Sequence, residues 1–465
     1  MYQINFNKPC RVYFMGIGGI SMSGLAEILL KEGFTITGSD MRESDLTRQL
    51  EEAGAKIYYQ QTASNIDPDA IDVVVYTAAI HEDHPELEKV IRLGIPRLTR
   101  AQLLGQIMKN YKTAIAVSGT HGKTTTTSMI TEVMLEAHED PTVTVGGMLD
   151  CIHGNFHLGE SDCFITEACE YTNSFLSFYP TVEAVLNIEA DHLDFFKDLN
   201  DIRHSFRLFM EKLPKGGVLV INSEIDHWQE LTAKLPCEVV TFGLEDSGAD
   251  YVAANVVYDE QARASFQLMR RGKDGLEKII DIHMNVPGIH NVKNALACSV
   301  MALEEGIAPE TIAAGLAKFG NAHRRFEYKG EVGKVAIVDD YAHHPQEIDA
   351  TLAAAKEMKK GKLWCVFQSH TYTRTKALLD EFARSLAAAD EVLLAPIYAA
   401  RETDTLGISS QDIADRIEKL GTKAHSFDSF DEIETFILSN CQPGDLVLTM
   451  GAGDIYRVGE KLLGL

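Results

Sequence analysis

One short segment of the chain has residue types that suit the binding of a phosphate group. The sequence SGTHGKTTTT at positions 118–127 follows the apolar run TAIAV and precedes a helical pattern. Gly119 and Gly122 allow the backbone to curl so that its N–H groups point inward, and the positive end of the following helix adds to the attraction for an anion. Lys123 supplies a cation for β- and γ-phosphates. The hydroxyl of Thr124 suits Mg²⁺, which prefers oxygen ligands.

This segment matches only the G-K-T end of the common phosphate-loop pattern. The full G-x-x-x-x-G-K-[ST] spacing requires glycine at position 117, where the chain has Val117. The alternative is a glycine-rich turn with a solvated lysine. Because a strand pattern precedes the segment and a helical pattern follows it, we favour a nucleotide-binding loop that is shorter than the common form.

A magnesium site needs more ligands than one threonine, and two further candidates follow strand patterns. Glu167 comes directly after the run FIT, and His192 follows the run AVLNI. Because the carboxyl ends of parallel strands meet at one edge of a sheet, we expect both side chains to lie beside Thr124. Asp191 and Asp194 flank the histidine and are placed to orient its ring. Taken singly, each is more often a helix-start acid or a surface histidine; their shared placement favours metal ligands.

A second glycine-rich turn, GIGGISMSGLA at positions 16–26, follows the apolar run RVYFM. Its N–H groups and the helix behind it are suited to a pyrophosphate. An acid at the end of the second strand of such a unit usually meets a ribose hydroxyl. The residues predicted to line this crevice come from the turn and from the ends of two further strands: Gly16, Gly18, Gly19, Asp40, Thr77 and Ala78.

The alternative for this turn is the dinucleotide site of an oxidoreductase. The G-x-G-x-x-G/A pattern requires glycine or alanine at position 21, where the chain has Ser21. Such an enzyme also has no use for the second phosphate loop at Lys123. We therefore disfavour this alternative.

Apolar, β-branched runs alternate with longer helical patterns along the chain. Strand–helix alternation of this kind predicts parallel sheets with helices on both faces. Three blocks open with a strand and a glycine-rich or polar turn, at RVYFMGIGG, TAIAVSGTHGKT and VAIVDDYAHHP. The predicted strands lie at 11–15, 35–38, 72–76, 113–117, 164–166, 184–188, 218–222, 239–243, 335–339, 363–367, 391–395 and 446–450.

Composition limits the partners. The 465 residues carry a formal charge of −25, which argues against nucleic acid but not against small phosphorylated ligands. The first residues lack the apolar core of a signal peptide, and the longest uncharged stretch, Val12 to Ala26, is too short to span a membrane. The eight cysteines are scattered without a C-x-x-C pair, which indicates thiols in a reducing compartment. We therefore expect a cytoplasmic protein.

These motifs together resemble the Mur ligases, the ATP-dependent amide-forming enzymes of peptidoglycan assembly. The resemblance begins with the loop at Lys123, the glutamate of TEACE and the histidine of NIEADHLD. It continues through PGIHNVKNALA (287–297), FGNAHRRFE (319–327), DDYAHHPQEI (339–348), FQSHTYTRT (367–375) and MGAGDI (450–455). Several independent motifs thus occur in order over nearly the whole chain.

The resemblance implies an α/β fold of three domains. These are a Rossmann-like UDP-sugar-binding domain at 1–105, a central P-loop ATPase-like parallel sheet that binds ATP at 106–321, and a Rossmann-like amino-acid-binding domain at 322–465. The joints fall near 98–112 and 321–330.

Two features point to the alanine-adding branch of the family. The loop GIGG resembles that branch, whereas the ligase that recycles murein tripeptide, the nearest rival, has a G-x-C-G pattern. The later ligases of the series resemble one another in a carbamylated lysine downstream of the histidine, and Phe206 occupies that place here. The resemblance therefore implies ligation of L-alanine to the carboxylate of UDP-N-acetylmuramate through an acyl phosphate, with release of ADP and phosphate.

The same resemblance implies site residues. Lys123, Glu167, His192 and Arg374 are the expected catalytic residues, and Thr124, Glu167 and His192 are the expected Mg²⁺ ligands. The expected ATP contacts are Gly119, Thr120, His121, Gly122, Lys123, Thr124, Thr125, His290, Asn291, Asn294, Arg325 and Asp340.

The third block is expected to hold the amino acid, with Tyr341, His343 and His344 projecting from a strand end. The guanidinium of Arg374 matches the geometry of the alanine carboxylate. Many relatives carry another arginine where this chain has Thr371, so the carboxylate clamp is either lighter here or completed by Lys376.

Two other classes of protein stay open as alternatives. A binding or regulatory protein that has lost catalysis would not need the intact set of loop lysine, threonine, glutamate and histidine. A ligase that adds glutamates to folate would not need the UDP-binding first block. The expected partners are ATP, UDP-N-acetylmuramate and L-alanine, with no nucleic acid and no membrane, in a monomer or homodimer.

Overall fold

The computed structural model describes residues 2–77, 80–193, 195–259, 263–320, 324, 326–358, 361–400 and 402–465. The chain divides into two compact units. The first comprises Met1–Val252, Arg270–Glu277 and Leu296–Gly315, and the second comprises Ala253–Met269, Lys278–Ala295 and Leu316–Leu465. In the described ranges, no helix has the length and apolar character needed to cross a membrane.

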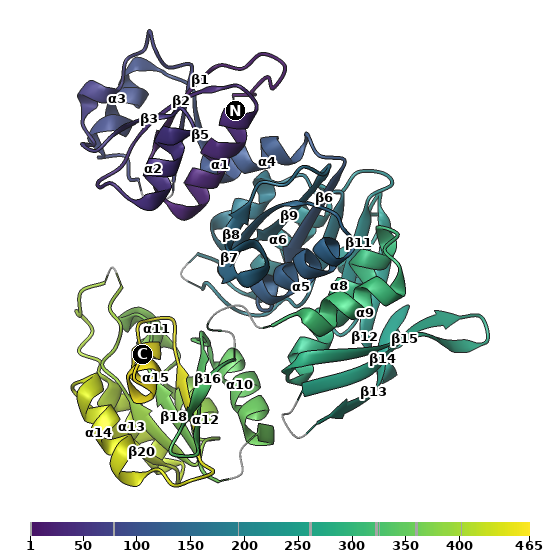
Figure 1. Cartoon of the computed structure of the whole chain (residues 1–465), viewed down its shortest axis with the longest axis vertical. Helices are drawn as coiled ribbons and strands as arrows, with labels where there is room; N and C mark the ends of the chain where they lie inside the picture. Colours follow the sequence, from purple (N-terminus) through teal and green to yellow (C-terminus); the bar gives the residue numbers. More distant parts are fainter. Residues whose placement is uncertain are drawn as a thin grey trace. The chain divides into compact units, whose positions relative to one another are not determined.

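A five-stranded parallel sheet opens the first unit, in the order β3-β2-β1-β4-β5 (Figure 1). Its strands are β1 (Arg11–Met15), β2 (Thr35–Ser39), β3 (Lys56–Tyr58), β4 (Val73–Tyr76) and β5 (Arg97–Thr99). The helices between them are α1 (Ile20–Lys31), α2 (Asp45–Glu52), η1 (Ala63–Asn65) and α3 (Pro85–Leu93), and α4 (Arg100–Met108) follows the last strand.

Side chains alternate across this sheet as a strand period of two requires. Val12 and Phe14 of β1 belong to the same buried cluster as Leu25 of α1. Tyr13 belongs to the cluster that holds Leu87 of α3. Helices therefore cover both faces, as predicted for a doubly wound sheet.

The central sheet has ten strands in the order β15-β14-β13-β12-β11-β10-β6-β9-β7-β8. Strands β12 to β7 in this order are parallel, and β8 pairs antiparallel with β7. The strands are β6 (Thr113–Ser118), β7 (Thr142–Leu149), β8 (Gly154–His157), β9 (Cys163–Ala168), β10 (Val182–Val185), β11 (Val218–Asn222), β12 (Glu238–Leu244), β13 (Tyr251–Tyr258), β14 (Arg263–Gly272) and β15 (Gly275–Pro287).

The helices of the central region are α5 (Lys123–Glu136), η2 (Asp150–Ile152), η3 (Tyr171–Ser177), α6 (Leu199–Met210), α7 (Trp228–Thr232), η4 (Glu245–Ser247), α8 (Ile289–Glu304) and α9 (Pro309–Lys318). Because β6, β9 and β10 are parallel neighbours, their carboxyl ends lie at one edge of the sheet. This edge holds the candidate phosphate site.

The C-terminal sheet lies in the second unit, in the order β16-β17-β21-β18-β19-β20. It is parallel except for β16, which pairs antiparallel with β17. Its strands are β16 (Glu327–Val332), β17 (Val335–Asp340), β18 (Leu363–Phe367), β19 (Glu391–Leu394), β20 (Lys423–Ser426) and β21 (Leu446–Met450). Its helices are α10 (Pro345–Met358), α11 (Tyr372–Ala377), α12 (Leu379–Leu386), α13 (Ser410–Lys419), α14 (Phe430–Asn440) and α15 (Tyr456–Leu463).

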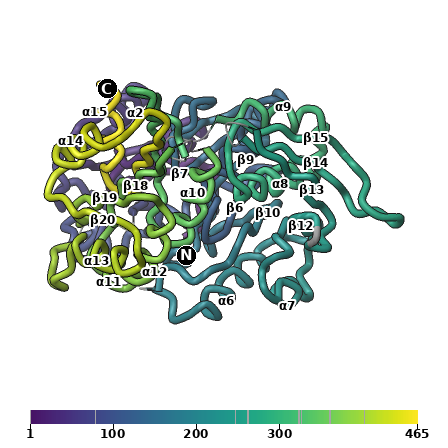
Figure 2. The backbone as a smooth tube through the Cα atoms, turned by 90° about the horizontal axis from the view of Figure 1, so that it is seen from below, coloured from purple at the N-terminus to yellow at the C-terminus, as the bar shows by residue number. Residues whose placement is uncertain are grey.

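Both faces of this sheet are buried. Cys365 and Phe367 of β18 belong to the cluster formed with α10, α12 and α13, whereas Trp364 and Val366 belong to the cluster formed with α14 and α15. The backbone trace in Figure 2 follows this region from α10 in green to α15 in yellow. The expected fold class, an α/β protein with three sheets, is confirmed.

The predicted strands are all present, and only one is displaced by more than a residue or two at its ends. The run at 184–188 was expected to be a strand, but β10 spans Val182–Val185. The chain leaves the sheet because Asn187 turns to the phosphate loop: its Oδ1 accepts from the backbone N–H of His121 at 2.7 Å, and its Nδ2 donates to the carbonyl of the same residue at 3.0 Å. Apolar character alone does not reveal this competing hydrogen bond.

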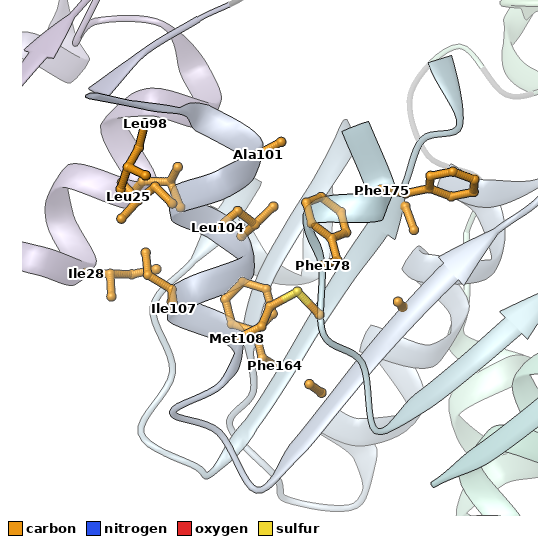
Figure 3. Packing of buried hydrophobic residues seen from close by; sticks show 14 of the residues in the cluster. Leu25, Ile28, Leu98, Ala101, Leu104, Ile107, Met108, Phe164, Phe175 and Phe178 are labelled. Atoms are coloured by element: carbon orange, nitrogen blue, oxygen red, sulfur yellow. The ribbon is translucent and has the colours of Figure 1, made fainter. Parts of the chain in front are cut away.

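The stretch expected to join the first and central domains, 98–112, contains the helix α4, and this helix is packed rather than loose. Leu104 and Ile107 of α4 lie in one buried cluster with Leu25 of α1 and Phe164 of β9 (Figure 3). A Cβ atom on Gly105 would lie 1.8 Å from the carbonyl oxygen of Ser177, so only glycine allows this approach. The first and central sheets therefore share one core.

Candidate active site

The phosphate loop lies between β6 and α5 and depends on two glycines. Gly119 and Gly122 have φ values of +143° and +85°, which side chains rarely adopt. A Cβ atom on Gly119 would also lie 3.0 Å from the Cβ of Leu186 on the neighbouring strand segment. The chain therefore reverses tightly enough for Lys123 to start α5 at the sheet edge.

The segment after β10 holds the middle of this loop in place. The backbone N–H of Thr120 donates to the carbonyl of Asn187 at 3.2 Å, and its hydroxyl accepts from the N–H of Glu189 at 2.9 Å. The His121 ring lies 3.4 Å from the Glu189 carboxylate. Together with the two hydrogen bonds of the Asn187 side chain, these contacts give the loop a defined shape.

Lys123 is enclosed by acceptors. Its Nζ donates to the carbonyls of Gly119 and Thr120 and lies 3.0 Å from Oε2 of Glu170. Burial works to lower the pKa of this ammonium, but the negative charge of Glu170, aided by Cys169 and Glu167, outweighs that effect and raises the pKa above its ordinary value. The lysine is therefore held as a cation.

Glu170 is not among the residues that the sequence pattern predicts for this site. The segment EACE contains two acids three residues apart, and of these only Glu167 lies in β9. In the structure, the Glu170 side chain is only 2% exposed and lies between Lys123 and His192. The available signal is a second carboxylate two residues after the end of a strand that carries a candidate ligand.

The three candidate metal ligands lie on the elements expected of them. Thr124 is in the first turn of α5, and Glu167 is in β9, where it pairs in register with Val117 of β6. Oε1 of Glu167 accepts from the N–H of Gly146 at 2.7 Å, which fixes the orientation of the carboxylate. This register places Glu167 beside the end of the strand that leads into the phosphate loop.

His192 follows β10 in the left-handed conformation, with φ of +53°. Its Nε2 lies 3.9 Å from Oε1 of Glu170 and 3.8 Å from Oδ2 of Asp191, so the predicted neighbour Asp191 does lie against the ring. Tyr171 packs against the other side, with ring centroids 4.5 Å apart. Asp194, the other predicted neighbour, lies outside the described residues.

The chemistry of these donors fits a hard divalent cation: a hydroxyl, a carboxylate and an imidazole. Across the described ranges, no group of three or more His, Cys, Asp or Glu side chains is arranged as a metal site. The assignment of Thr124, Glu167 and His192 as ligands of a cation, together with oxygens of a phosphate, stays a prediction.

The first glycine loop is closed by an acid from the neighbouring strand. The N–H groups of Gly16 and Ile17 donate to the carbonyl of Ser39, and the N–H of Gly18 donates to Oδ2 of Asp40 at 2.8 Å. Gly19 precedes α1 and its carbonyl accepts from the first turn of the helix.

Another predicted residue of this crevice, Thr77, directly follows β4. A Cβ atom on Gly16 would lie 3.7 Å from the side chain of Thr77, so these two residues are neighbours. Ala78 lies outside the described residues. The structure thus brings together five of the six residues, and their role in UDP-sugar binding stays a prediction.

A buried carboxylate that the sequence pattern does not predict, Glu86, supports this crevice. Glu86, in the first turn of α3, accepts hydrogen bonds from the hydroxyls of Tyr13 and Ser39 and from Nδ2 of Asn65, at 2.6–2.8 Å. Burial and the neighbouring charge of Glu86 raise the pKa of Tyr13. This network anchors Ser39, whose carbonyl in turn holds the glycine loop.

In the second unit, the predicted ATP contacts of the α8 start form a compact polar group. Asn291 donates to the carbonyl of Pro287 at 2.8 Å, and Asn294 donates to Oδ1 of Asn291 at 3.3 Å. Burial lowers the pKa of His290 to about 4, so its ring is neutral at physiological pH. A neutral ring suits contact with an uncharged base.

Asp340 ends β17, and its carboxylate holds the neighbouring backbone. It accepts from the N–H groups of Phe326 and Ala342 at 2.6 and 2.7 Å and from the hydroxyl of Thr351 at 3.1 Å. Arg324 is likewise engaged, with Nε 3.0 Å from Asp339. The role of Asp340 as an ATP contact stays a prediction, and Arg325 lies outside the described residues.

Arg374 lies in α11, near His370. Burial, together with the positive charges of His343 and Arg374, lowers the pKa of His370 to about 4. The Arg374 side chain is partly exposed, and its pairing with a carboxylate ligand stays a prediction. Thr371 caps this helix, and Lys376 donates to the carbonyl of Leu406 at 3.2 Å.

Three family models match the chain in order. They are the Mur ligase family catalytic domain at residues 11–112, the Mur ligase middle domain at 117–302 and the Mur ligase glutamate ligase domain at 324–453. The chain belongs to the Mur ligase family.

Similarity to individual Mur ligases extends over the whole length. The UDP-N-acetylmuramate–L-alanine ligase of Agathobacter rectalis is 56% identical over 463 residues, and that of Lachnospira eligens is 53% identical over 463 residues; in both comparisons 100% of each chain is covered. The crystal structure of UDP-N-acetylmuramate-alanine ligase MurC from Thermotoga maritima is 29% identical, with a TM-score of 0.77 and 98% of each chain covered.

Proposed function

We propose that this Mur ligase uses ATP to join L-alanine to the carboxylate of UDP-N-acetylmuramate. The products are UDP-N-acetylmuramoyl-L-alanine, ADP and phosphate, and the reaction belongs to peptidoglycan precursor synthesis. One observation carries the proposal: the similarity to the alanine ligase of Agathobacter rectalis covers the entire chain, including both glycine loops and the site around Lys123.

The proposed domains each serve one substrate. Residues 1–105 bind the UDP-sugar through the loop closed by Asp40, residues 106–321 bind ATP through the loop at Lys123, and residues 322–465 bind the amino acid. In this assignment Arg374 pairs with the carboxylate of L-alanine, since a guanidinium matches a carboxylate in shape and charge.

The proposed reaction has two steps. A carboxylate oxygen of the sugar attacks the γ-phosphorus of ATP, the bond to the β-phosphate oxygen breaks, and ADP leaves. The amine of L-alanine then attacks the acyl carbon, the bond to the phosphate oxygen breaks, and the amine loses a proton. Lys123 neutralises the β- and γ-phosphates in the first step, and catalysis is mainly positioning and charge neutralisation.

Thr124, Glu167 and His192 are the proposed holders of Mg²⁺. When bound, the cation supplies charge neutralisation for the transferred phosphoryl group. Asp191, which lies against His192, would orient the imidazole, as a carboxylate does for many metal-binding histidines.

The proposed setting is the cytoplasm, with small-molecule substrates and a monomer or homodimer as the assembly. All eight cysteines are free thiols, which agrees with a reducing compartment.

A substrate screen tests this function. Purified protein is incubated with ATP, Mg²⁺ and UDP-N-acetylmuramate, each amino acid is supplied in turn, and phosphate release is measured. We expect release with L-alanine that depends on the UDP-sugar. Phosphate release that ignores UDP-N-acetylmuramate, or that requires a tripeptide in place of L-alanine, would contradict the proposal.

A further inference from the structure

Glu170 occupies a position that the proposed mechanism does not use. Its carboxylate is almost completely buried and contacts the loop lysine through both oxygens, at 3.0 and 3.4 Å from Nζ of Lys123. Its Oε1 also lies 3.9 Å from Nε2 of His192. A buried negative charge therefore lies between the phosphate loop and the proposed metal ligands.

The lysine cannot bind a phosphate without giving up an existing acceptor. An ammonium has three N–H donors, and the carbonyls of Gly119 and Thr120 together with Glu170 accept from Lys123. The two carbonyls belong to a loop that Asn187 ties to the strand beside it. The Glu170 side chain is therefore the acceptor that an arriving phosphate displaces.

The charges at this edge also disfavour a bare polyphosphate. Lys123 contributes one positive charge, whereas Glu170 and Glu167 contribute one negative charge each. Like charges held a few ångströms apart repel strongly when they are shielded from water. A divalent cation changes the repulsion into attraction. The same carboxylates that repel the phosphates attract the cation that the phosphates carry.

We propose that Glu170 makes nucleotide binding depend on the metal: it pairs with Lys123 and opposes a polyphosphate that arrives without a divalent cation. The inference rests on the proposed function, since it takes Lys123 as a ligand of nucleotide phosphates. It adds a discriminating role for a residue that is not among the proposed metal ligands. Glu170 thereby limits occupation of the loop by metal-free ATP or ADP.

The test measures nucleotide binding rather than turnover. ADP is titrated into the full chain by calorimetry, without UDP-sugar or amino acid, once in excess Mg²⁺ and once in EDTA. Glu170→Gln removes the charge but keeps an oxygen that can accept from Lys123. We expect about tenfold to a hundredfold tighter binding of metal-free ADP, by the removal of one buried charge, and less than a threefold change in Mg²⁺.

Two further variants serve as controls for the charge of Glu170 and for metal binding. Glu170→Asp retains the charge and should keep the weak metal-free binding of the unmodified chain, within about threefold by the same reasoning. Glu167→Gln removes a proposed metal ligand and should weaken binding in Mg²⁺, which Glu170→Gln does not. Circular dichroism of each variant verifies folding before titration.

Two sets of results would contradict the inference. If Glu170→Gln weakens both arms alike, or leaves both unchanged, Glu170 is only a structural partner of Lys123 and the inference fails while the proposed function stands. If the unmodified chain binds ADP in neither arm, the proposed function fails and the inference fails with it.

Discussion

The first unit contains two glycine loops of similar local form but opposite chemistry. Gly16–Gly19 and Gly119–Gly122 both follow a parallel strand and precede a helix. In the first loop, an N–H group donates to the Asp40 carboxylate of the neighbouring strand. In the second loop, the cation of Lys123 is held at the start of the helix beside Glu170.

The difference shows that the strand–turn–helix unit does not by itself select a ligand. Neighbouring strands deliver the side chains that decide it: β2 delivers Asp40 to the first loop, and β9 with the turn after it delivers Glu167 and Glu170 to the second. An acid that accepts hydrogen bonds suits sugar hydroxyls, whereas a lysine with nearby carboxylates suits a phosphate chain with its cation. The comparison predicts separable effects of mutation.

The largest effect is expected at the cation of the central loop. Lys123→Ala should lower kcat by at least about a thousandfold, because the charge that develops on the transferred phosphoryl group loses its neutralising partner in a water-poor site. Steady-state phosphate release measures it. Lys215→Ala, at an exposed turn, is the matched control and should retain the parental rate. Unchanged turnover in Lys123→Ala would remove the loop from the mechanism.

A smaller loss is expected at the carboxylate of β9. Glu167→Gln should lower kcat by about a hundredfold and raise the Mg²⁺ concentration needed for half-maximal rate, because a charged oxygen ligand is replaced by a neutral one. A Mg²⁺ titration of the reaction rate measures both. If the Mg²⁺ requirement of the variant equals that of the unmodified chain, Glu167 is not a metal ligand.

The first loop should respond in substrate affinity rather than in chemistry. Asp40→Ala removes the acceptor of the Gly18 N–H group, and we expect KM for UDP-N-acetylmuramate to rise by about tenfold to a hundredfold with little change in kcat. Nucleotide binding at the central loop should not change. Glu52→Ala, an exposed acid of α2, serves as the control. A fall in kcat without a change in KM would show that the two loops do not act separately.

The smallest effect is expected at the support of the first loop. Ser39→Ala removes one of three hydrogen bonds to the buried carboxylate of Glu86, and we expect a loss of about 1–2 kcal/mol in the free energy of unfolding. Chemical denaturation followed by fluorescence and circular dichroism measures the loss. Ser39→Ala should leave ADP binding at the central loop unaltered. A change in ADP binding would mean that the network around Glu86 also supports the central loop.

Some features of the site were predictable because they depend on neighbours in the chain. Glycines at 119 and 122 are required by positive φ, and β-branched runs such as TAIAV and VLVIN form buried parallel strands. Glu167 and His192 were predictable as residues that follow such strands, since parallel strand ends meet at one edge.

Other features were not predictable because they depend on the path of turns and on distant contacts. The choice of Glu170 as the partner of Lys123 arises after β9, where Thr172 and Asn173 both have left-handed backbone conformations. The early end of β10 follows from the bond between Asn187 and the loop. Neither Glu170 nor Asn187 has a local sequence pattern that distinguishes it from its neighbours in the chain.

By itself, the sequence determined the alternation of strands and helices, the two glycine loops and the ends of strands at which chemistry is placed, because short-range sterics and hydrophobic periodicity act within a few residues. Only the tertiary structure decided which carboxylate faces the lysine, how Glu86 supports the first loop, and that α1 and α4 join the first and central sheets in one core. These depend on long-range packing, where a buried charge or polar group is stable only if a partner from a distant segment reaches it.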